Sequence, residues 1–85
     1  MNSGEAAGFS VTETKLIAIW CDVLRKELIQ ADDDFVDIGG DSLSAMLCIY
    51  RVQAEFGIDL DLEDFFFEPA TVRGLAAIVD RATAG

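Results

Sequence analysis

Residues 39–57 read GGDSLSAMLCIYRVQAEFG, and this stretch contains the start, the body and the end of one helix. Asp41 suits the N-cap position and Gly57 suits the C-terminal stop, so the stretch predicts a helix over 42–56. The two glycines before the cap permit backbone conformations closed to other residues and leave room for another protein to approach. Ser42 is therefore expected to be exposed at a helix N-terminus.

The predicted helix is apolar on two sides when its residues are placed about 100° apart. One stripe consists of Ala45, Cys48, Ile49, Val52 and Phe56. The other consists of Leu43, Met46, Leu47, Tyr50 and Ala54. A small bundle can cover one stripe readily but not both, and the alternative is that both are buried. We assign the first stripe to the core and predict that the second is an exposed surface for partner docking, because it flanks Ser42.

An earlier helix is indicated by apolar residues at helical spacing through about residue 28. These residues are Leu16, Ile17, Trp20, Val23, Leu24 and Leu28. Thr12 as N-cap predicts a start at that residue, although Ser10 and Glu13 offer a competing capping box.

Two further helices are expected after the quoted stretch. Asp61 can cap a short helix over 62–67, which Pro69 stops. Thr71 can cap a last helix, whose apolar residues are Val72, Leu75, Ala76, Ile78 and Val79. No alternation typical of strands is present, so the fold class is all-α: a small bundle of three main helices and one short helix.

A chain of 85 residues with 52% hydrophobic residues forms one small domain. We expect a disordered lead-in over 1–10, the bundle over 11–82 and a short tail over 83–85. The net charge of −10 disfavours nucleic acid and anionic lipid as partners and favours proteins with basic or apolar docking surfaces. Neither an apolar run of about 20 residues nor a secretory signal pattern is present, so a cytoplasmic protein is expected. We also expect a monomer.

No metal site is predicted. Asp32, Asp33 and Asp34 lie in a loop expected over 30–41, but their spacing does not match a calcium-binding EF-hand loop, and we interpret them as solvated, partner-facing carboxylates. Cys21 and Cys48 cannot complete a zinc site in a chain without histidine, and we interpret both as buried free thiols.

The chemistry of Ser42 has competing interpretations. Residues 40–43 also spell the nucleophile motif of a family of lipases and esterases. A serine nucleophile of that kind needs a positioned histidine, and the chain contains none, so an internal triad is excluded. Ser42 is then expected to be a point of attachment, while a plain acidic adaptor without a prosthetic group is the remaining alternative.

The order of elements and several motifs resemble the thiolation, or carrier, domains of nonribosomal peptide and polyketide assembly, most closely peptidyl carrier proteins. The resemblance covers about 11–81. Its strongest part is DDFVDIGGDSL over 33–43, supported by Ala45-Met46, Phe56-Gly57-Ile58 and FFEPATVRGLA over 66–76. The departures from the family pattern are Val36, Ile38 and Ala70, and none of them touches the serine.

The resemblance implies a four-helix bundle of acyl-carrier type that catalyses nothing itself. Ser42 would be the attachment point of 4'-phosphopantetheine, transferred from coenzyme A by a phosphopantetheinyl transferase with magnesium. Gly39, Gly40, Asp41 and Leu43 would form the recognition context of that serine. The helix N-terminus favours the negative charge of a phosphodiester, which agrees with this role.

The resemblance also implies that the arm carries an acyl group as a thioester between enzymes. An adenylation or acyltransferase enzyme would load it, and condensation, ketosynthase, tailoring or thioesterase enzymes would use it. The double glycine favours an aminoacyl or peptidyl cargo, with a polyketide or other acyl carrier as the alternative. Docking is expected at Leu43, Met46, Leu47 and Tyr50.

Two expectations follow from this interpretation. Ser44 lies about 200° around the helix from Ser42, so it should not be modified. Gly40→Val is expected to slow modification more than it lowers stability, because the glycine is taken to serve the turn and the approach of the transferase.

Overall fold

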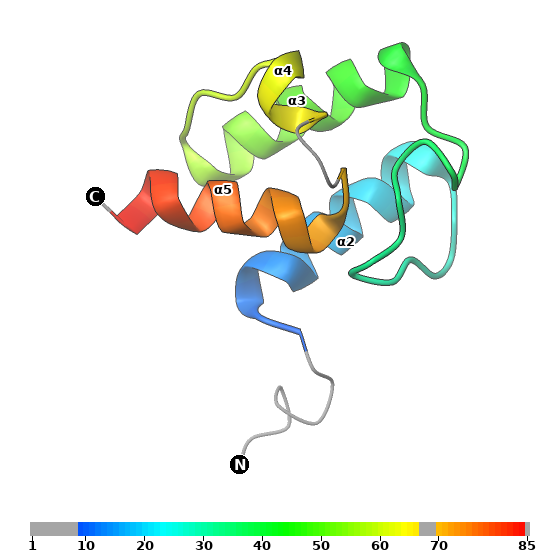
Figure 1. Ribbon diagram of the computed structural model, residues 1–85, viewed down its shortest axis with the longest axis horizontal. Helices are drawn as coiled ribbons and strands as arrows, with labels where there is room; N and C mark the ends of the chain where they lie inside the picture. The colour runs from blue at the N-terminus through cyan, green and yellow to red at the C-terminus, as the bar shows by residue number, and fades with distance from the viewer. Residues whose placement is uncertain (1–8, 67–69, 85) are drawn as a thin grey trace.

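The computed structural model describes residues 9–66 and 70–84, and within these residues the chain forms α-helices and no β-strand (Figure 1). The helices are α2 (Val11–Leu24), α3 (Ser42–Phe56), α4 (Leu62–Phe65) and α5 (Val72–Ala84). α2 packs against α3 and α5, and the short α4 packs against α3 and α5. The predicted all-α bundle of three main helices and one short helix is confirmed.

The N-cap of α2 is Ser10, two residues before the predicted cap Thr12. The Ser10 hydroxyl accepts a hydrogen bond from the Glu13 N–H at 3.0 Å, and the Glu13 carboxylate accepts one from the Ser10 N–H at 3.0 Å. This reciprocal pair satisfies two N–H groups at the helix end, whereas a cap at Thr12 satisfies one. The competing capping box is therefore correct, and Ser10 belongs to the folded part rather than to a disordered lead-in. Residues 1–8 of that lead-in lie outside the described residues.

The predicted continuation of this helix to about residue 28 is wrong. α2 ends at Leu24 because Arg25 adopts a left-handed conformation with φ of 58°. The chain leaves the helical path there, so the helical spacing no longer directs Leu28 to the core, and its side chain is 74% exposed. Ile29, one residue further along the chain, is buried in its place.

The other helix ends agree more closely with the sequence. Asp41 and Gly57 cap α3, and Asp61 caps α4 by accepting from the Asp64 N–H at 2.8 Å. The Thr71 hydroxyl caps α5 by accepting from the Gly74 N–H at 3.0 Å. α4 ends at Phe65, before the predicted residue 67, and the proposed stop at Pro69 lies outside the described residues. α5 continues to Ala84, past position 82, where the domain was expected to end.

Three aromatic rings form the centre of the core. Phe35, from the loop between α2 and α3, has its ring centroid 4.9 Å from that of Trp20 and 4.9 Å from that of Phe65, both in edge-to-face arrangements. Such arrangements contribute about 0.5–1.5 kcal/mol each beyond the buried area. The loop residue Phe35 is thus wedged between α2 and α4.

The first stripe of α3 faces this core, as predicted. Ala45, Cys48, Ile49 and Val52 are buried, and Phe56 at the helix end is half-buried. Cys48 is the buried free thiol that was expected, and burial raises its pKa to about 12. Cys21 is only half-buried, so that part of the prediction is wrong.

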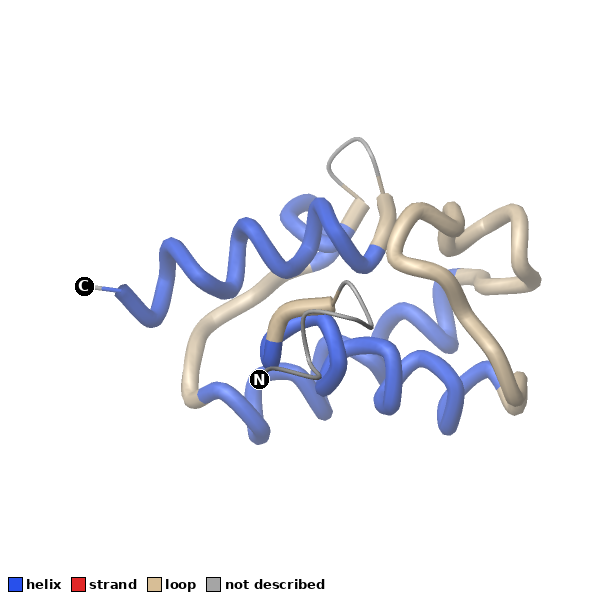
Figure 2. The backbone as a smooth tube through the Cα atoms, turned by 90° about the horizontal axis from the view of Figure 1, so that it is seen from below, coloured by secondary structure: helices blue, strands red, loops and turns tan. Residues whose placement is uncertain are grey.

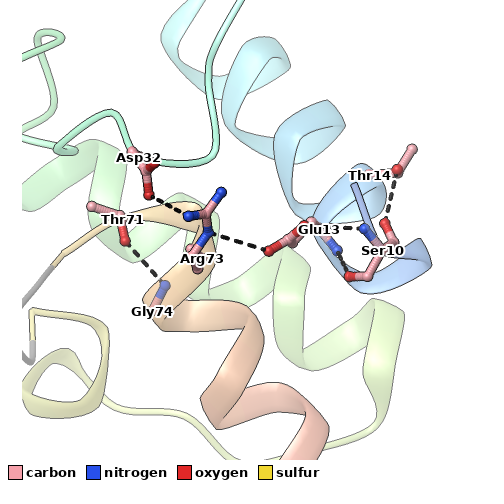
Figure 3. A network of polar contacts seen from close by, with 7 residues as sticks. All are labelled: Ser10, Glu13, Thr14, Asp32, Thr71, Arg73 and Gly74. Atoms are coloured by element: carbon pink, nitrogen blue, oxygen red, sulfur yellow. Dashed lines mark hydrogen bonds and ion pairs between the residues drawn. The ribbon is translucent and has the colours of Figure 1, made fainter. Parts of the chain in front are cut away.

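The long loop between α2 and α3 lies beside the beginning of α5 (Figure 2). The Phe35 N–H donates to the Ala70 carbonyl at 2.9 Å, and the Arg73 N–H donates to the Ala31 carbonyl at 3.0 Å. The Arg73 guanidinium group also lies 3.2 Å from the Asp32 carboxylate and 3.8 Å from that of Glu13 (Figure 3). These contacts hold the loop across the ends of two helices, and the loop leads directly to Ser42.

Candidate functional site

Ser42 is the first residue of α3 and its side chain is exposed, as the sequence predicts. The preceding residue, Asp41, has extended backbone angles, and its carbonyl accepts the first intrahelical hydrogen bond from the Ala45 N–H at 2.8 Å. Its carboxylate accepts from the Ser44 N–H at 2.9 Å. Because Asp41 is the N-cap, the Ser42 hydroxyl is not needed to cap the helix, and the Ser42 side chain is exposed to solvent.

Ser44 completes a capping box at this helix end, which sequence reasoning missed. Its hydroxyl oxygen accepts from the Asp41 N–H at 2.8 Å and lies 2.9 Å from the Asp41 Oδ1 atom, to which it can donate. Hydrogen bonds from Ser44 lower the pKa of the Asp41 carboxyl, and its N–H contributes more than its hydroxyl. The Asp-x-x-Ser pattern in the sequence could have predicted this capping box, but the usual capping box has Glu or Gln, not Ser, at the third helical position.

The two positions before the cap require glycine for different physical reasons. Gly39 has a φ of +105°, a conformation that residues with a Cβ atom rarely adopt. Gly40 donates its N–H to the Phe35 carbonyl at 2.9 Å, and a Cβ atom on it would lie only 2.3 Å from the Phe35 ring. The space that Gly40 leaves is therefore filled by Phe35 and is not open to a partner enzyme. On this ground we now predict that Gly40→Val lowers the stability of the domain more than it slows modification, the opposite of what the sequence suggested.

The second stripe of α3 is exposed, so the alternative in which both stripes are buried is wrong. Leu43 is 72% exposed, Met46 54%, Leu47 51% and Tyr50 73%. We call these four residues the α3 apolar face. It begins next to Ser42 and extends for two turns, and Ala54, the last member of the stripe, is also exposed.

The aspartates before the site are engaged in local contacts, which the interpretation as solvated, partner-facing groups did not include. Asp33 accepts from the Gln30 N–H at 2.8 Å, and Asp34 accepts from the Val36 N–H at 2.9 Å. Asp32 pairs with Arg73. Their carboxylates hold the turns of the loop, and no cluster of three or more His, Cys, Asp or Glu side chains within 9–66 and 70–84 is arranged to hold a metal ion.

Comparison with known proteins agrees with this geometry. The family described as "Phosphopantetheine attachment site" matches residues 14–79. Surfactin synthase subunit 1 of Bacillus subtilis is 45% identical over 74 residues, which are 87% of this chain and 2% of that protein. Tyrocidine synthase 2 of Brevibacillus parabrevis is 41% identical over 70 residues, which are 82% of this chain and 2% of that protein. The chain thus spans only a small fraction of the length of these relatives.

Solved structures give the same result. The structure of the phosphopantetheine transferase Sfp with coenzyme A and a peptidyl carrier protein contains a chain with a TM-score of 0.82 and 36% identity, covering 86% of this chain and 94% of that one. A peptidyl carrier domain described as a prototype for modular peptide synthetases has a TM-score of 0.75 and 38% identity, covering 84% and 92%.

The order of the helices, the exposed serine at the start of α3 and these matches define a carrier domain. The chain belongs to the phosphopantetheine attachment-site family and is of the peptidyl carrier class, with 4'-phosphopantetheine as its prosthetic group. The family, fold and cofactor expected from the sequence are confirmed.

Proposed function

We propose that Ser42 carries the 4'-phosphopantetheine group and that the domain holds an aminoacyl or peptidyl thioester during natural-product biosynthesis. The observation that supports this most is the position of Ser42: an exposed hydroxyl on the first turn of α3, behind a cap made by its neighbour Asp41. The domain itself performs no catalysis in this proposal. Its residues present the serine and the prosthetic group to other enzymes.

The residues at the start of α3 fit the group. The first N–H groups of a helix lack intrahelical acceptors and attract a phosphodiester, with the helix dipole adding to the attraction. The Asp41 carboxylate opposes this, but it is exposed, so water screens the repulsion. When bound, 4'-phosphopantetheine supplies the thiol that holds an acyl group as a thioester.

Relatives support the expected partners. Similar chains occur in a complex with the transferase Sfp and coenzyme A, and in an adenylation and carrier protein, McyG, with phenylalanyl-adenylate. We propose a phosphopantetheinyl transferase and an adenylation enzyme as partners of this chain, followed by condensation, tailoring or thioesterase enzymes. No helix in the described part of the chain is long and apolar enough to cross a membrane, and we propose a cytoplasmic, monomeric domain.

The second candidate function is that of a polyketide or other acyl carrier protein, and similarity to a type-II acyl carrier protein favours it. BlmI of Streptomyces verticillus, involved in bleomycin biosynthesis, has a TM-score of 0.81 and 28% identity, covering 96% of each chain. The same Ser42 would then carry a different acyl group. Loading with candidate adenylation enzymes and amino acids, against acyltransferases and acyl donors, separates the two by the mass of the loaded product.

Intact mass before and after incubation with coenzyme A and a broad-specificity transferase tests the proposed function. We expect complete conversion to the pantetheinylated mass. An unchanged mass, in a reaction that converts a known peptidyl carrier protein in the same tube, would favour the acidic adaptor without a prosthetic group.

We further propose that the α3 apolar face is the docking surface for the partner enzymes. Met46→Asp and Tyr50→Asp in the pantetheinylated protein should each change the free energy of unfolding by less than about 0.5 kcal/mol, because both side chains are exposed. Loading by the partner adenylation enzyme should fall by about tenfold or more in kcat/KM, because a charge is then placed in an apolar contact. Melting temperature and loading rate are the measurements.

Leu28→Asp is the matched control for these variants. Leu28 is as exposed as Tyr50, at 74% against 73%, and lies outside α3. The same added charge there should leave loading at the parental rate. Equal losses for all three variants, or parental rates for Met46→Asp and Tyr50→Asp, would remove the docking role from this face.

A further inference from the structure

The start of α3 differs from the start of α2 in how its capping box is built. In α2 the third helical residue is Glu13, whose carboxylate can only accept a hydrogen bond from Ser10 (Figure 3). In α3 the third residue is Ser44, whose hydroxyl accepts from the Asp41 N–H at 2.8 Å and can also donate. The atoms within reach of that donation are Asp41 Oδ1 at 2.9 Å and the Asp41 carbonyl oxygen at 3.1 Å.

The consequence falls on the Asp41 side chain. Its Oδ1 atom receives the Ser44 N–H and lies within reach of the Ser44 hydroxyl, both at 2.9 Å. These contacts fix one orientation of a carboxylate that is otherwise exposed to water. Both contacts of Ser44 with the Asp41 carboxylate are made at Oδ1. The other carboxylate oxygen, Oδ2, is therefore the one available to accept a hydrogen bond from another molecule.

The charge of Asp41 is also available to a partner. The ion pairs among residues 9–66 and 70–84 engage other carboxylates, those of Glu13, Asp22, Asp32 and Glu55. Hydrogen bonding to Ser44 favours the charged form of Asp41, so the group is anionic at neutral pH. An oriented carboxylate next to Ser42 is suited to a cationic or N–H group of an enzyme that must bring its active site to the serine.

We propose that Ser44 is a positioning residue for the modification of Ser42: it holds Asp41 so that Oδ2 is presented to a cationic or N–H donor group of the phosphopantetheine-transferring enzyme. This inference rests on the proposed function. Ser44 is not modified and does not touch the reacting atoms. It acts through Asp41.

Three substitutions at Ser44 separate positioning from capping. Ser44→Ala removes both hydrogen bonds of the hydroxyl, Ser44→Thr keeps them, and Ser44→Gln restores an acceptor for the Asp41 N–H, as in an ordinary capping box. We expect Ser44→Ala to lower kcat/KM for pantetheine transfer by about three- to tenfold, mostly through a higher KM for the carrier. Ser44→Thr should transfer at the parental rate, while Ser44→Gln should recover the melting temperature without recovering the KM.

The capping box of α2 supplies a control for stability alone. Ser10→Ala removes the corresponding cap from a helix end that does not carry the serine, so it should lower the melting temperature without changing the transfer rate. NMR titration supplies a readout independent of transfer, since the pKa of Asp41 should rise in Ser44→Ala and stay low in Ser44→Thr.

A double-mutant cycle identifies the route of the effect. In an Asp41→Ala background there is no carboxylate to orient, so Ser44→Ala should cause no further loss of kcat/KM. Full additivity of the two losses, or a parental KM in Ser44→Ala, would overturn the positioning role. If instead the parent protein gains no pantetheine mass, the proposed function fails and the Ser44 proposal fails with it; normal conversion of the parent with a parental Ser44→Ala rate rejects only the latter.

Discussion

Ser42→Ala is expected to fold like the parent and to gain no pantetheine mass under conditions that convert the parent completely. The substitution removes one exposed oxygen atom, and the cap of α3 is made by Asp41 and Ser44 rather than by Ser42. Alanine also has the higher helix propensity, so the free energy of unfolding should change by less than about 0.5 kcal/mol. Circular dichroism melting and intact mass after incubation with coenzyme A and transferase are the measurements.

Ser44→Ala is the matched control because it deletes the same atom two positions further along the helix. Its hydroxyl is bonded to Asp41, so Ser44 is not a competing attachment point, and the variant should still reach full conversion, although more slowly. A pantetheine mass gain by Ser42→Ala would show that another residue carries the group. Loss of helical signal in Ser42→Ala would show that the hydroxyl serves the fold, contrary to its exposed position.

The sequence predicted α3 and its site well because local and tertiary signals agree there. Asp41 and Gly57 mark the ends of the helix, and the stripe that reaches Phe56 is the one that the bundle covers. Consistency between caps, periodicity and burial is what makes such a segment readable. The exposure of the second stripe followed from the small size of the domain, which can bury only part of its apolar surface.

The errors lie where the decisive contact is not local. Helical spacing continues to Leu28, but Arg25 takes a left-handed conformation without the glycine that usually announces a helix end. The burial of Ile29 in place of Leu28 depends on how the following loop crosses the bundle. The contact of Gly40 with Phe35 has the same origin, because Phe35 is placed by its hydrogen bond to Ala70 and by the rings around it. Periodicity carries no information about such a path.

Gly40→Ala is expected to lower the stability of the domain more than it slows pantetheine transfer to the molecules that remain folded. The added Cβ would lie 2.3, 2.4 and 2.7 Å from ring carbons of Phe35, which is fully buried and held by Trp20 and Phe65. Overpacking of this kind costs about 1–3 kcal/mol, and in a domain of this size that lowers the melting temperature by about 5–20 °C. Gly40→Val should be worse, because two further methyl groups must find space.

Gly57→Ala provides the comparison that separates steric overlap from backbone strain. Gly57 has a φ of +67° and open space around its would-be Cβ, so its substitution costs only the left-handed conformation, about 1–2 kcal/mol. Gly40 has no such φ, and the cost there arises from the ring. Phe35→Leu removes ring atoms from that space, so it should reduce the penalty of Gly40→Ala in the double variant even though Phe35→Leu alone leaves a void. Thermal melts of the parent, both single variants and the double variant measure this coupling, and strictly additive losses would mean that Gly40 and the Phe35 ring do not compete for the same space.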